Sequence, residues 1–327
     1  MPSRGKQHAV PAPQPAPVDS AEDAAAAYAR DGLFWMQNVL TDEELAALQA
    51  SAAESFAQVL RGLMTQLMSG GGELPIRYAE VVARDGARFD CRHGMDLSPL
   101  SLLLRPGGLA AALLPLLRRV LGEDAEVCQV GQIIAMTEED WEVIHEETDT
   151  FTDQKWHTDG RNSANDTDAL TVFIPLVDVT AANGATEFVL GSHAESSGGA
   201  QSDDERSARA TPLLVPAGSA IAFDYRTWHR GLRNRGEVCR PVLYAIVGRP
   251  VWRDGLKGLP QLDGGSVSLF GGEEVPPRPG WSLRAAEPAP AAAEVRAEVT
   301  PPPPPSEAPR VQRASRKRAA PAGQLTR

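Results

Sequence analysis

The run Leu170-Thr-Val-Phe-Ile-Pro-Leu-Val-Asp-Val179, with Asn183-Gly184 and Ala185–Leu190 after it, decides the fold class of this chain. Val, Ile, Phe and Thr dominate the first run, as in a buried strand, and Asn-Gly is a strong turn signal between two strands. Short runs of the same kind follow at 213–223, 227–229 and 241–247. Because no helical pattern separates these runs, they predict a β-sandwich or barrel.

Helical patterns precede the predicted strands. Ala21–Asp31 is rich in alanine, and Thr41-Asp-Glu-Glu44 is a capping box that predicts the start of a second helix. The apolar face of that second helix, which we expect to pack on the sheet, holds Leu45, Leu48, Ala52, Phe56, Val59, Leu60 and Leu63. We expect a third helix at Leu109–Leu121, with a kink or restart at Pro115, and a strand at Val127–Ala135. The expected fold is mainly β with flanking α-helices.

Two histidines and an aspartate form the candidate metal site. His157 and Asp159 lie in Trp156-His-Thr-Asp-Gly160, and His229 lies 70 positions after Asp159. Two imidazoles and one carboxylate on one face of an iron(II) ion define the ligand set of many non-haem iron oxygenases. Arg240 follows His229 by 11 positions, and its parity on the next strand lets it point into the barrel. Its planar guanidinium suits a carboxylate, so these four residues predict an oxygenase that uses a carboxylate co-substrate.

Other histidines compete with this pair. With six histidines and 43 acidic residues in 327, about one His-x-Asp/Glu is expected by chance, and three occur. His145 lies in an acidic run typical of a solvated loop or helix face. His193 follows a Gly-Ser turn and leads into a polar loop. We therefore assign structural roles to His93, His145 and His193 and retain the pair at His157.

The chain resembles the phytanoyl-CoA dioxygenase family, within the iron(II)- and 2-oxoglutarate-dependent oxygenases that have a double-stranded β-helix (jelly-roll) core. The resemblance extends over about residues 21–250 and is carried by four blocks, Tyr28–Phe34 with Val39–Leu45, Gln154–Gly160, Asn183–His193 and His229–Arg240. One departure is Leu190, where the family usually has proline, and it concerns a turn rather than the chemistry. Residues 60–125 match only loosely, so the resemblance carries no substrate identity.

The resemblance implies a set of cofactors and a reaction. Fe(II) is expected on His157, Asp159 and His229, and 2-oxoglutarate is expected with its far carboxylate on Arg240. With O2 as the third reactant, a C–H bond of a small-molecule or lipid-like substrate would be hydroxylated, with release of succinate and CO2. The carboxylate of Asp159 argues against a halogenase, because halide needs its place.

Two further residues are candidates for contacts with the co-substrate. Gln154 could hydrogen-bond substrate, co-substrate or a ligand carboxylate, and its alternative role is that of a polar loop residue. Thr186 could offer a hydroxyl to the co-substrate, and its alternative is a strand threonine that faces solvent.

Two other functions stay open. A cupin-type metal dioxygenase without 2-oxoglutarate would leave Arg240 unexplained. A catalytically degenerate oxygenase fold could serve as a scaffold, with the proline-rich tail recruiting partners.

A group of arginines in residues 77–92 could bind a carboxylate or phosphate on the substrate. The alternative is pairing with neighbouring acidic residues. The arginines are Arg77, Arg84, Arg88 and Arg92, and the acidic residues are Glu80, Asp85, Asp90 and Asp96.

Composition divides the chain into three parts. Residues 1–20 are expected to form a disordered segment, 21–285 the oxygenase domain, and 286–327 a disordered Pro/Ala-rich tail with a basic cluster. Residues 284–327 hold eight basic and four acidic residues, so the rest of the chain is more acidic than the net charge of −11. That acidity disfavours nucleic acid as a partner, and a small-molecule substrate is expected instead.

The remaining expectations concern location. No run of 18 apolar residues occurs, so no membrane span is expected. Cys91, Cys128 and Cys239 are scattered and form no CxxC, which favours a reducing compartment and a cytoplasmic protein. The basic cluster Arg316-Lys-Arg318 could be a nuclear address or a weak protein contact, and its alternative is a solvated tail.

Overall fold

The structure is a computed structural model. It describes residues 13–69, 78, 80–91, 108–144, 151–160, 169–195, 201–249 and 281–282, and the statements below concern these residues. The chain divides into two compact units, Met1–Ala285 and Ala286–Arg327. The second unit lies outside the described residues, so the disorder expected for the tail stays a prediction.

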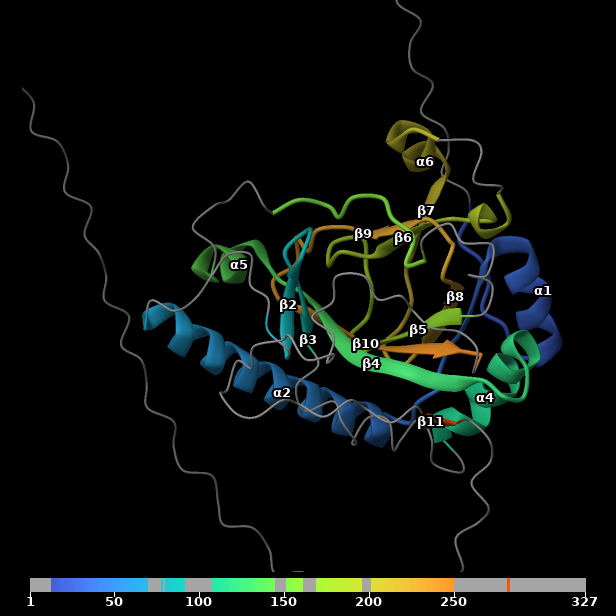
Figure 1. The fold of residues 1–327 in the computed structure, drawn as a ribbon, viewed down its shortest axis with the longest axis horizontal. Helices are drawn as coiled ribbons and strands as arrows, with labels where there is room; N and C mark the ends of the chain where they lie inside the picture. Colours follow the sequence, from blue (N-terminus) through green and yellow to red (C-terminus); the bar gives the residue numbers. More distant parts are fainter. Residues whose placement is uncertain are drawn as a thin grey trace, which may run out of the picture. The chain divides into compact units, whose positions relative to one another are not determined.

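Two antiparallel sheets form the centre of the described fold (Figure 1). The larger sheet has the order β1 (Leu33–Met36), β8 (Ala220–Asp224), β5 (Ala169–Pro175), β10 (Arg240–Gly248), β4 (Glu126–Ala135), β3 (Arg88–Cys91) and β2 (Val81–Arg84), with β11 (Trp281–Ser282) also on β4. The smaller sheet has the order β7 (Ala210–Leu213), β6 (Thr186–Val189) and β9 (His229–Gly231). The two sheets do not close into one barrel. The prediction of a mainly β fold with a double-stranded β-helix core and flanking helices is confirmed.

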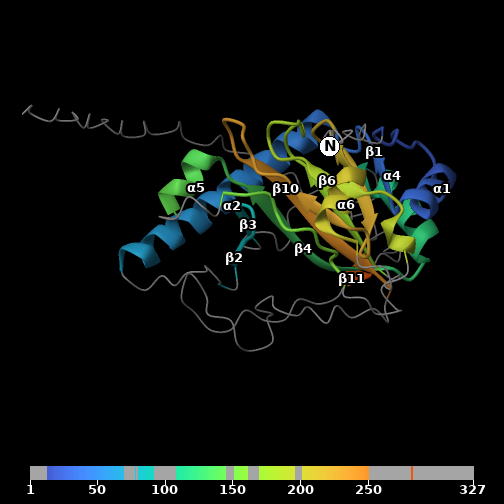
Figure 2. The ribbon, with the colours of Figure 1, turned by 90° about the horizontal axis from the view of Figure 1, so that it is seen from above.

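Helices cover the outer face of the larger sheet. In Figure 1, α2 runs along the side opposite β6 and β9, and Figure 2 shows α1 and α4 together near β1. The helices are α1 (Ala21–Asp31), α2 (Asp42–Met68), α4 (Gly108–Leu121), α5 (Glu138–Ile144) and α6 (Asp203–Arg209), with a short 3-10 turn at Ser192–Ala194. All three helices expected from the sequence are therefore present.

Local signals account for the helix ends. The Ser20 side chain accepts a hydrogen bond from the backbone of Asp23, and Gly32 ends α1 at a φ of 74°. The predicted capping box of α2 is present, with the Thr41 backbone donating to the Glu44 carboxylate at 2.9 Å. Because α4 continues through Pro115 as one helix, the restart expected there does not occur.

Strand alternation sorts the side chains of the larger sheet into two sets. Leu170, Val172 and Ile174 of β5 pack into one core with residues of α1, α2 and α4. Phe173 of β5 packs instead with Tyr244 of β10, on the opposite face. This second face is closed by the smaller sheet, where Phe188 packs against residues of β1 and β8. The candidate site lies in this inner space between the sheets.

The segment before α1 contacts the larger sheet, since Val18 is buried and the Trp35 indole donates to the Pro15 carbonyl at 2.8 Å. These contacts hold the segment against β1. The strand expected to continue to Val179 ends at Pro175, where backbone bonds pass to the turn at Gly218. Among the described helices, none has the length and apolar character needed to cross a bilayer.

The inward stripe of α2 provides a test of stability. Leu63 is 2% exposed, and Met64 beside it is 41% exposed. We expect Leu63→Ala to lower the free energy of unfolding by about 2–5 kcal/mol, because it removes packed methyl groups and leaves a cavity. Met64→Ala is the matched control and should change it by less than about 0.5 kcal/mol. Equilibrium urea unfolding measures both values, and equal losses would contradict the orientation of α2.

Candidate metal centre

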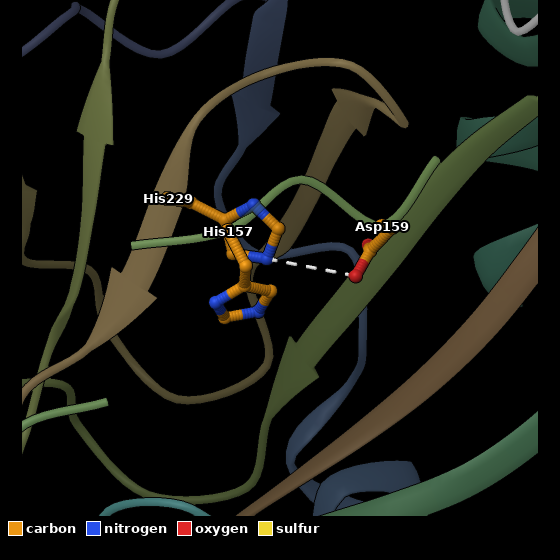
Figure 3. Close-up of side chains that lie close together, drawn as sticks. All are labelled: His157, Asp159 and His229. Atoms are coloured by element: carbon orange, nitrogen blue, oxygen red, sulfur yellow. Dashed lines mark ion pairs between the residues drawn. The ribbon is translucent and has the colours of Figure 1, made fainter. Parts of the chain in front are cut away.

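Backbone pairing brings the two candidate histidine ligands together. The His157 N–H donates to the His229 carbonyl at 3.1 Å, and the His229 N–H donates back at 2.9 Å. The pairing extends to Gln154, whose N–H donates to the carbonyl of Gly231 at 2.9 Å. Directly paired residues on antiparallel strands place their side chains on the same face. The imidazole centroids are consequently only 4.4 Å apart (Figure 3).

Asp159 completes the cluster two residues after His157. Its Oδ1 lies 3.7 Å from Nε2 of His229, and one ligand atom from each of the three residues lies within 4.8 Å of the others. The other carboxylate oxygen accepts a hydrogen bond from the Thr171 hydroxyl at 2.9 Å. Thr171 is a buried residue of β5, so the larger sheet orients the carboxylate while the smaller sheet carries His229.

The histidines are arranged to present a lone pair. Nδ1 of His157 lies 2.8 Å from the Lys155 carbonyl, and Nδ1 of His229 lies 2.9 Å from the Thr227 carbonyl. A carbonyl only accepts, so each Nδ1 carries the proton and each Nε2 is free to coordinate when the ring is neutral. Burial lowers the pKa of His229 below its ordinary value, and the neighbouring His157 lowers it further. The buried imidazole is therefore neutral near pH 7.

This donor set fits iron(II). Two neutral imidazoles and one ionised carboxylate match the facial set of non-haem iron enzymes. The cluster is graded in exposure, since His229 is buried, His157 is half-buried and Asp159 is exposed, so it has an open side for further ligands. Within the described ranges, this is the one group of His, Cys, Asp and Glu side chains with such a geometry.

Arg240 begins β10 and is 3% exposed. It shares its parity with Tyr244, which lies on the inner face. Its Nε donates to the Asn183 carbonyl at 3.0 Å, and it forms no ion pair with any described residue. Burial lowers the pKa of the guanidinium to about 10, so it is charged at neutral pH. The inner face therefore holds a buried cation without a carboxylate partner in the described structure.

Gln154 and Thr186 both lie near Gly231 of β9. The Gln154 side-chain oxygen accepts from the Gly231 N–H at 2.9 Å, so this oxygen stabilises the pairing with β9. Thr186 pairs with Gly231 and lies two residues before the fully buried Phe188 on β6. Because residues two apart on a strand share a face, Thr186 is directed inward and not to solvent. Both residues lie on the segments that adjoin His229.

Aromatic rings form the wall behind His229. The ring of Phe223 lies 4.9 Å from the His229 ring in an edge-on arrangement, and the ring of Phe188 lies 5.9 Å from it. Sequence reasoning did not identify these two rings or the hydroxyl of Thr171. A threonine in the middle of an otherwise apolar strand was the available signal for Thr171.

The other sequence candidates are not part of the His157, Asp159 and His229 cluster. Arg84 pairs with Asp90 at 2.7 Å, as the alternative of neighbour pairing expected, whereas Arg88 is buried and donates to backbone carbonyls. His193 packs against the Tyr28 ring and takes no part in the cluster. Of the remaining candidates, four lie outside the described ranges: Arg77, Arg92, His93 and His145.

The two tryptophans that precede the histidine ligands point away from the site, because neighbouring residues on a strand face opposite sides. The Arg206 guanidinium lies over Trp228 at 3.7 Å, and that of Arg230 lies over Trp156 at 4.5 Å. The Trp156 indole also donates to the Ser207 hydroxyl at 3.1 Å. Helix α6 therefore packs against the outer side of both ligand-bearing segments.

The hydrogen bond from Thr171 to Asp159 can be tested with metal alone. We expect Thr171→Val, which keeps the shape but removes the hydroxyl, to weaken Fe(II) binding by roughly tenfold or more, because the carboxylate loses its orienting partner. Thr171→Ser keeps the hydroxyl and should bind nearly as the wild type does. Anaerobic Fe(II) titration calorimetry measures both. Equal affinities for the valine and serine variants would contradict an orienting role.

Comparisons with known proteins agree with this geometry. The sequence matches the phytanoyl-CoA dioxygenase (PhyH) family over residues 28–242. The fold is similar to that of the non-heme alpha-ketoglutarate-dependent epimerase SnoN from nogalamycin biosynthesis, with 19% identity, a TM-score of 0.52, and coverage of 82% of this chain and 98% of that chain.

Two further solved structures show the same fold. A SnoN complex with Fe3+, alpha-ketoglutarate and nogalamycin RO has 20% identity, a TM-score of 0.52, and coverage of 81% of this chain and 98% of that chain. EvdMO1 has 18% identity, a TM-score of 0.50, and coverage of 70% of this chain and 50% of that chain. At these identities the structures show the fold alone, whereas the family match extends over most of the chain. This chain belongs to the phytanoyl-CoA dioxygenase family.

Proposed function

We propose that this protein is an Fe(II)- and 2-oxoglutarate-dependent dioxygenase that hydroxylates a C–H bond of a small-molecule or lipid-like substrate. The observation that carries the proposal is the pairing of two features on one inner face. These are the cluster of His157, Asp159 and His229, and the buried, unpaired cation of Arg240. Membership of the phytanoyl-CoA dioxygenase family supports it, as does a similar fold solved with Fe3+ and alpha-ketoglutarate.

The cluster would hold the iron through Nε2 of the two histidines and a carboxylate oxygen of Asp159. Bound iron would supply the activation of O2, coupled to the oxidative decarboxylation of 2-oxoglutarate. The overall balance is one substrate C–H bond, one 2-oxoglutarate and one O2 converted to one C–OH group, one succinate and one CO2. Each oxygen atom of O2 is accounted for, one in the alcohol and one in succinate.

The side chains of this chain would supply binding and orientation. Arg240 would hold the far carboxylate of 2-oxoglutarate, and its low-dielectric surroundings strengthen that attraction. Thr186 and the amide of Gln154 are the candidates for further hydrogen bonds. The rings of Phe188 and Phe223 would exclude water from one side of His229, and Thr171 would hold Asp159 in place.

Two competing functions lack a comparable observation. A cupin-type dioxygenase without 2-oxoglutarate gives no reason for a buried Arg240. A scaffold with a degenerate site gives no reason for three ligand atoms within 4.8 Å of one another. Contacts of the proline-rich basic tail with proteins remain a separate proposal, because that tail lies outside the described residues. We also propose a cytoplasmic setting, which the free thiols of Cys91 and Cys239 support.

The proposal predicts a ligand-dependent absorption band. Anaerobic Fe(II)-loaded protein should develop the weak visible charge-transfer band of a chelating 2-oxo acid when 2-oxoglutarate is added. Arg240→Ala should need roughly thirtyfold more 2-oxoglutarate or above, because the variant leaves a buried carboxylate without its partner. The solvent-exposed Arg61 serves as the control, and Arg61→Ala should titrate as the wild type does.

The outcomes separate the three functions. A band in the wild type that shifts to higher 2-oxoglutarate in Arg240→Ala supports the dioxygenase. Iron binding without a band would favour a dioxygenase that does not use 2-oxoglutarate. Failure to bind iron at all would favour the scaffold.

A further inference from the structure

The turn between β8 and β9 contacts both the histidine end and the aspartate end of the cluster. Nδ1 of His229 lies 2.9 Å from the carbonyl of Thr227, which accepts its proton. The carbonyl of Tyr225 accepts the backbone N–H of Gly160, the residue after Asp159, also at 2.9 Å. The two ligands face each other in Figure 3, with Nε2 and Oδ1 3.7 Å apart. Two carbonyls of one turn therefore hold the ring of one ligand and the backbone beside the other.

Asp224 closes this turn from inside the protein. Its backbone carbonyl accepts the N–H of Thr227 at 2.9 Å, which is the bond from residue i to residue i+3 of a β-turn. One oxygen of its carboxylate accepts the backbone N–H of Arg226 at 2.8 Å and Nε of the same residue at 2.9 Å. The other oxygen accepts from Nη2 of Arg226 at 2.8 Å. The carboxylate thus holds the middle of the turn through the backbone and the side chain of one residue.

Tyr28 connects the same carboxylate to α1. Its hydroxyl donates to Asp224 at 2.5 Å, and the side chain of Asp224 is fully buried. Burial raises the pKa of the Tyr28 hydroxyl far above its ordinary value, and the charge of Asp224 raises it further, so the hydroxyl keeps the proton that it donates. Tyr28 and Arg226 together satisfy both oxygens of a carboxylate that is shielded from water. The turn is consequently anchored to the helix as well as to its own backbone.

Both ends of the turn are bound to a single carbonyl at the end of α1. The N–H of Asp224 donates to the Gly32 carbonyl at 2.8 Å, and the hydroxyl of Thr227 donates to the same carbonyl at 3.2 Å. Gly32 has a φ of 74°, and an added Cβ there would lie 2.6 Å from the Thr227 hydroxyl oxygen, so only glycine fits. The path of the turn toward His229 is therefore fixed at its first and last residues.

We propose that Asp224 is a positioning residue for the metal centre, because its buried carboxylate sets the turn whose carbonyls orient His229 and place Asp159. The ring of His229 then keeps its proton on Nδ1 and directs Nε2 at the metal before the metal binds. This inference rests on the proposed function, since it takes the cluster to be an iron site. The competing role for Asp224 is to stabilise the fold alone.

Iron binding by the full-length protein tests the proposal. Asp224→Asn keeps the size of the side chain but replaces one carboxylate oxygen by an amide nitrogen, which cannot accept from Arg226 or Tyr28. We expect this change to raise the Kd for Fe(II) roughly tenfold, measured by anaerobic titration calorimetry. Asp31, a buried residue of α1 that pairs with Arg30, is the matched control. Asp31→Asn should bind Fe(II) as the wild type does.

A second readout separates the orientation of the ring from the stability of the fold. In the metal-free protein, nitrogen NMR of isotope-labelled histidine should show the Nδ1–H tautomer of His229, because the Thr227 carbonyl accepts that proton. Asp224→Asn should show a mixture of the two neutral tautomers, because the released turn no longer holds this carbonyl in place. The signal is assigned by its loss in His229→Gln.

The two roles of Asp224 give different results. A weaker affinity for Fe(II) together with a mixed tautomer supports the positioning role. If Asp224→Asn bound Fe(II) as the wild type does, or lost no more affinity than Asp31→Asn, the positioning role would be overturned. A weaker affinity with an unchanged tautomer would overturn the route through Thr227.

The proposed function can fail separately. A wild type that binds Fe(II) but gives no absorption band with 2-oxoglutarate would overturn the proposed function and leave the test of Asp224 intact. A wild type that binds no Fe(II) would overturn both.

Tyr28→Phe keeps the proposal testable if Asp224→Asn does not fold. This variant removes one hydroxyl and leaves the carboxylate with its bonds to Arg226, so the expected loss of Fe(II) affinity is smaller, roughly threefold. The tautomer of His229 should shift in the same direction. An Fe(II) affinity and a tautomer equal to those of the wild type would overturn the anchoring of the turn through Asp224.

Discussion

The candidate centre depends on the pair of backbone hydrogen bonds exchanged between His157 and His229. This exchange makes two residues that are distant in sequence direct cross-strand neighbours, with both imidazoles on the inner side. The same alternation sends Trp156 and Trp228 to the outer side, where Arg206 and Arg230 of the chain cover them. A shift of one residue in this pairing would place indoles on the inner side in place of the imidazoles, so the candidate metal site depends on this register.

The inner face combines a neutral imidazole, that of His229, with a charged guanidinium, that of Arg240. Burial favours the neutral form of His229, which a metal ligand needs, and it also strengthens the attraction of Arg240 for an anion. The packed rings of Phe188 and Phe223 exclude water from His229. Arg240 is buried separately, at the start of β10, where it donates to the Asn183 carbonyl.

Strand and helix positions followed from local signals in the sequence, whereas the partners across the sheets did not. The Thr41–Glu44 capping box and the Asn183-Gly184 turn act over a few residues, so their structures could be predicted. The metal ligands could be proposed because His-x-Asp and a distant histidine have few other uses together. The hydrogen bond from Thr171 to Asp159 and the contact of Arg88 with Gly231 depend on register, which no local pattern encodes.

Arg88 illustrates why composition near a motif can mislead. Four arginines among acidic neighbours suggested either surface pairing or substrate binding, and Arg84 does pair with Asp90. Arg84 and Arg88 are paired across the hairpin, but the Arg84 side chain is 37% exposed whereas Arg88 is 1% exposed. Arg88 pairs with Ala135 of β4, which pairs with Arg240 on its other side. The charge of Arg88 is therefore directed inward, where it is shielded from water. There the carbonyls of Gly86 and Leu232 accept its hydrogen bonds in place of water.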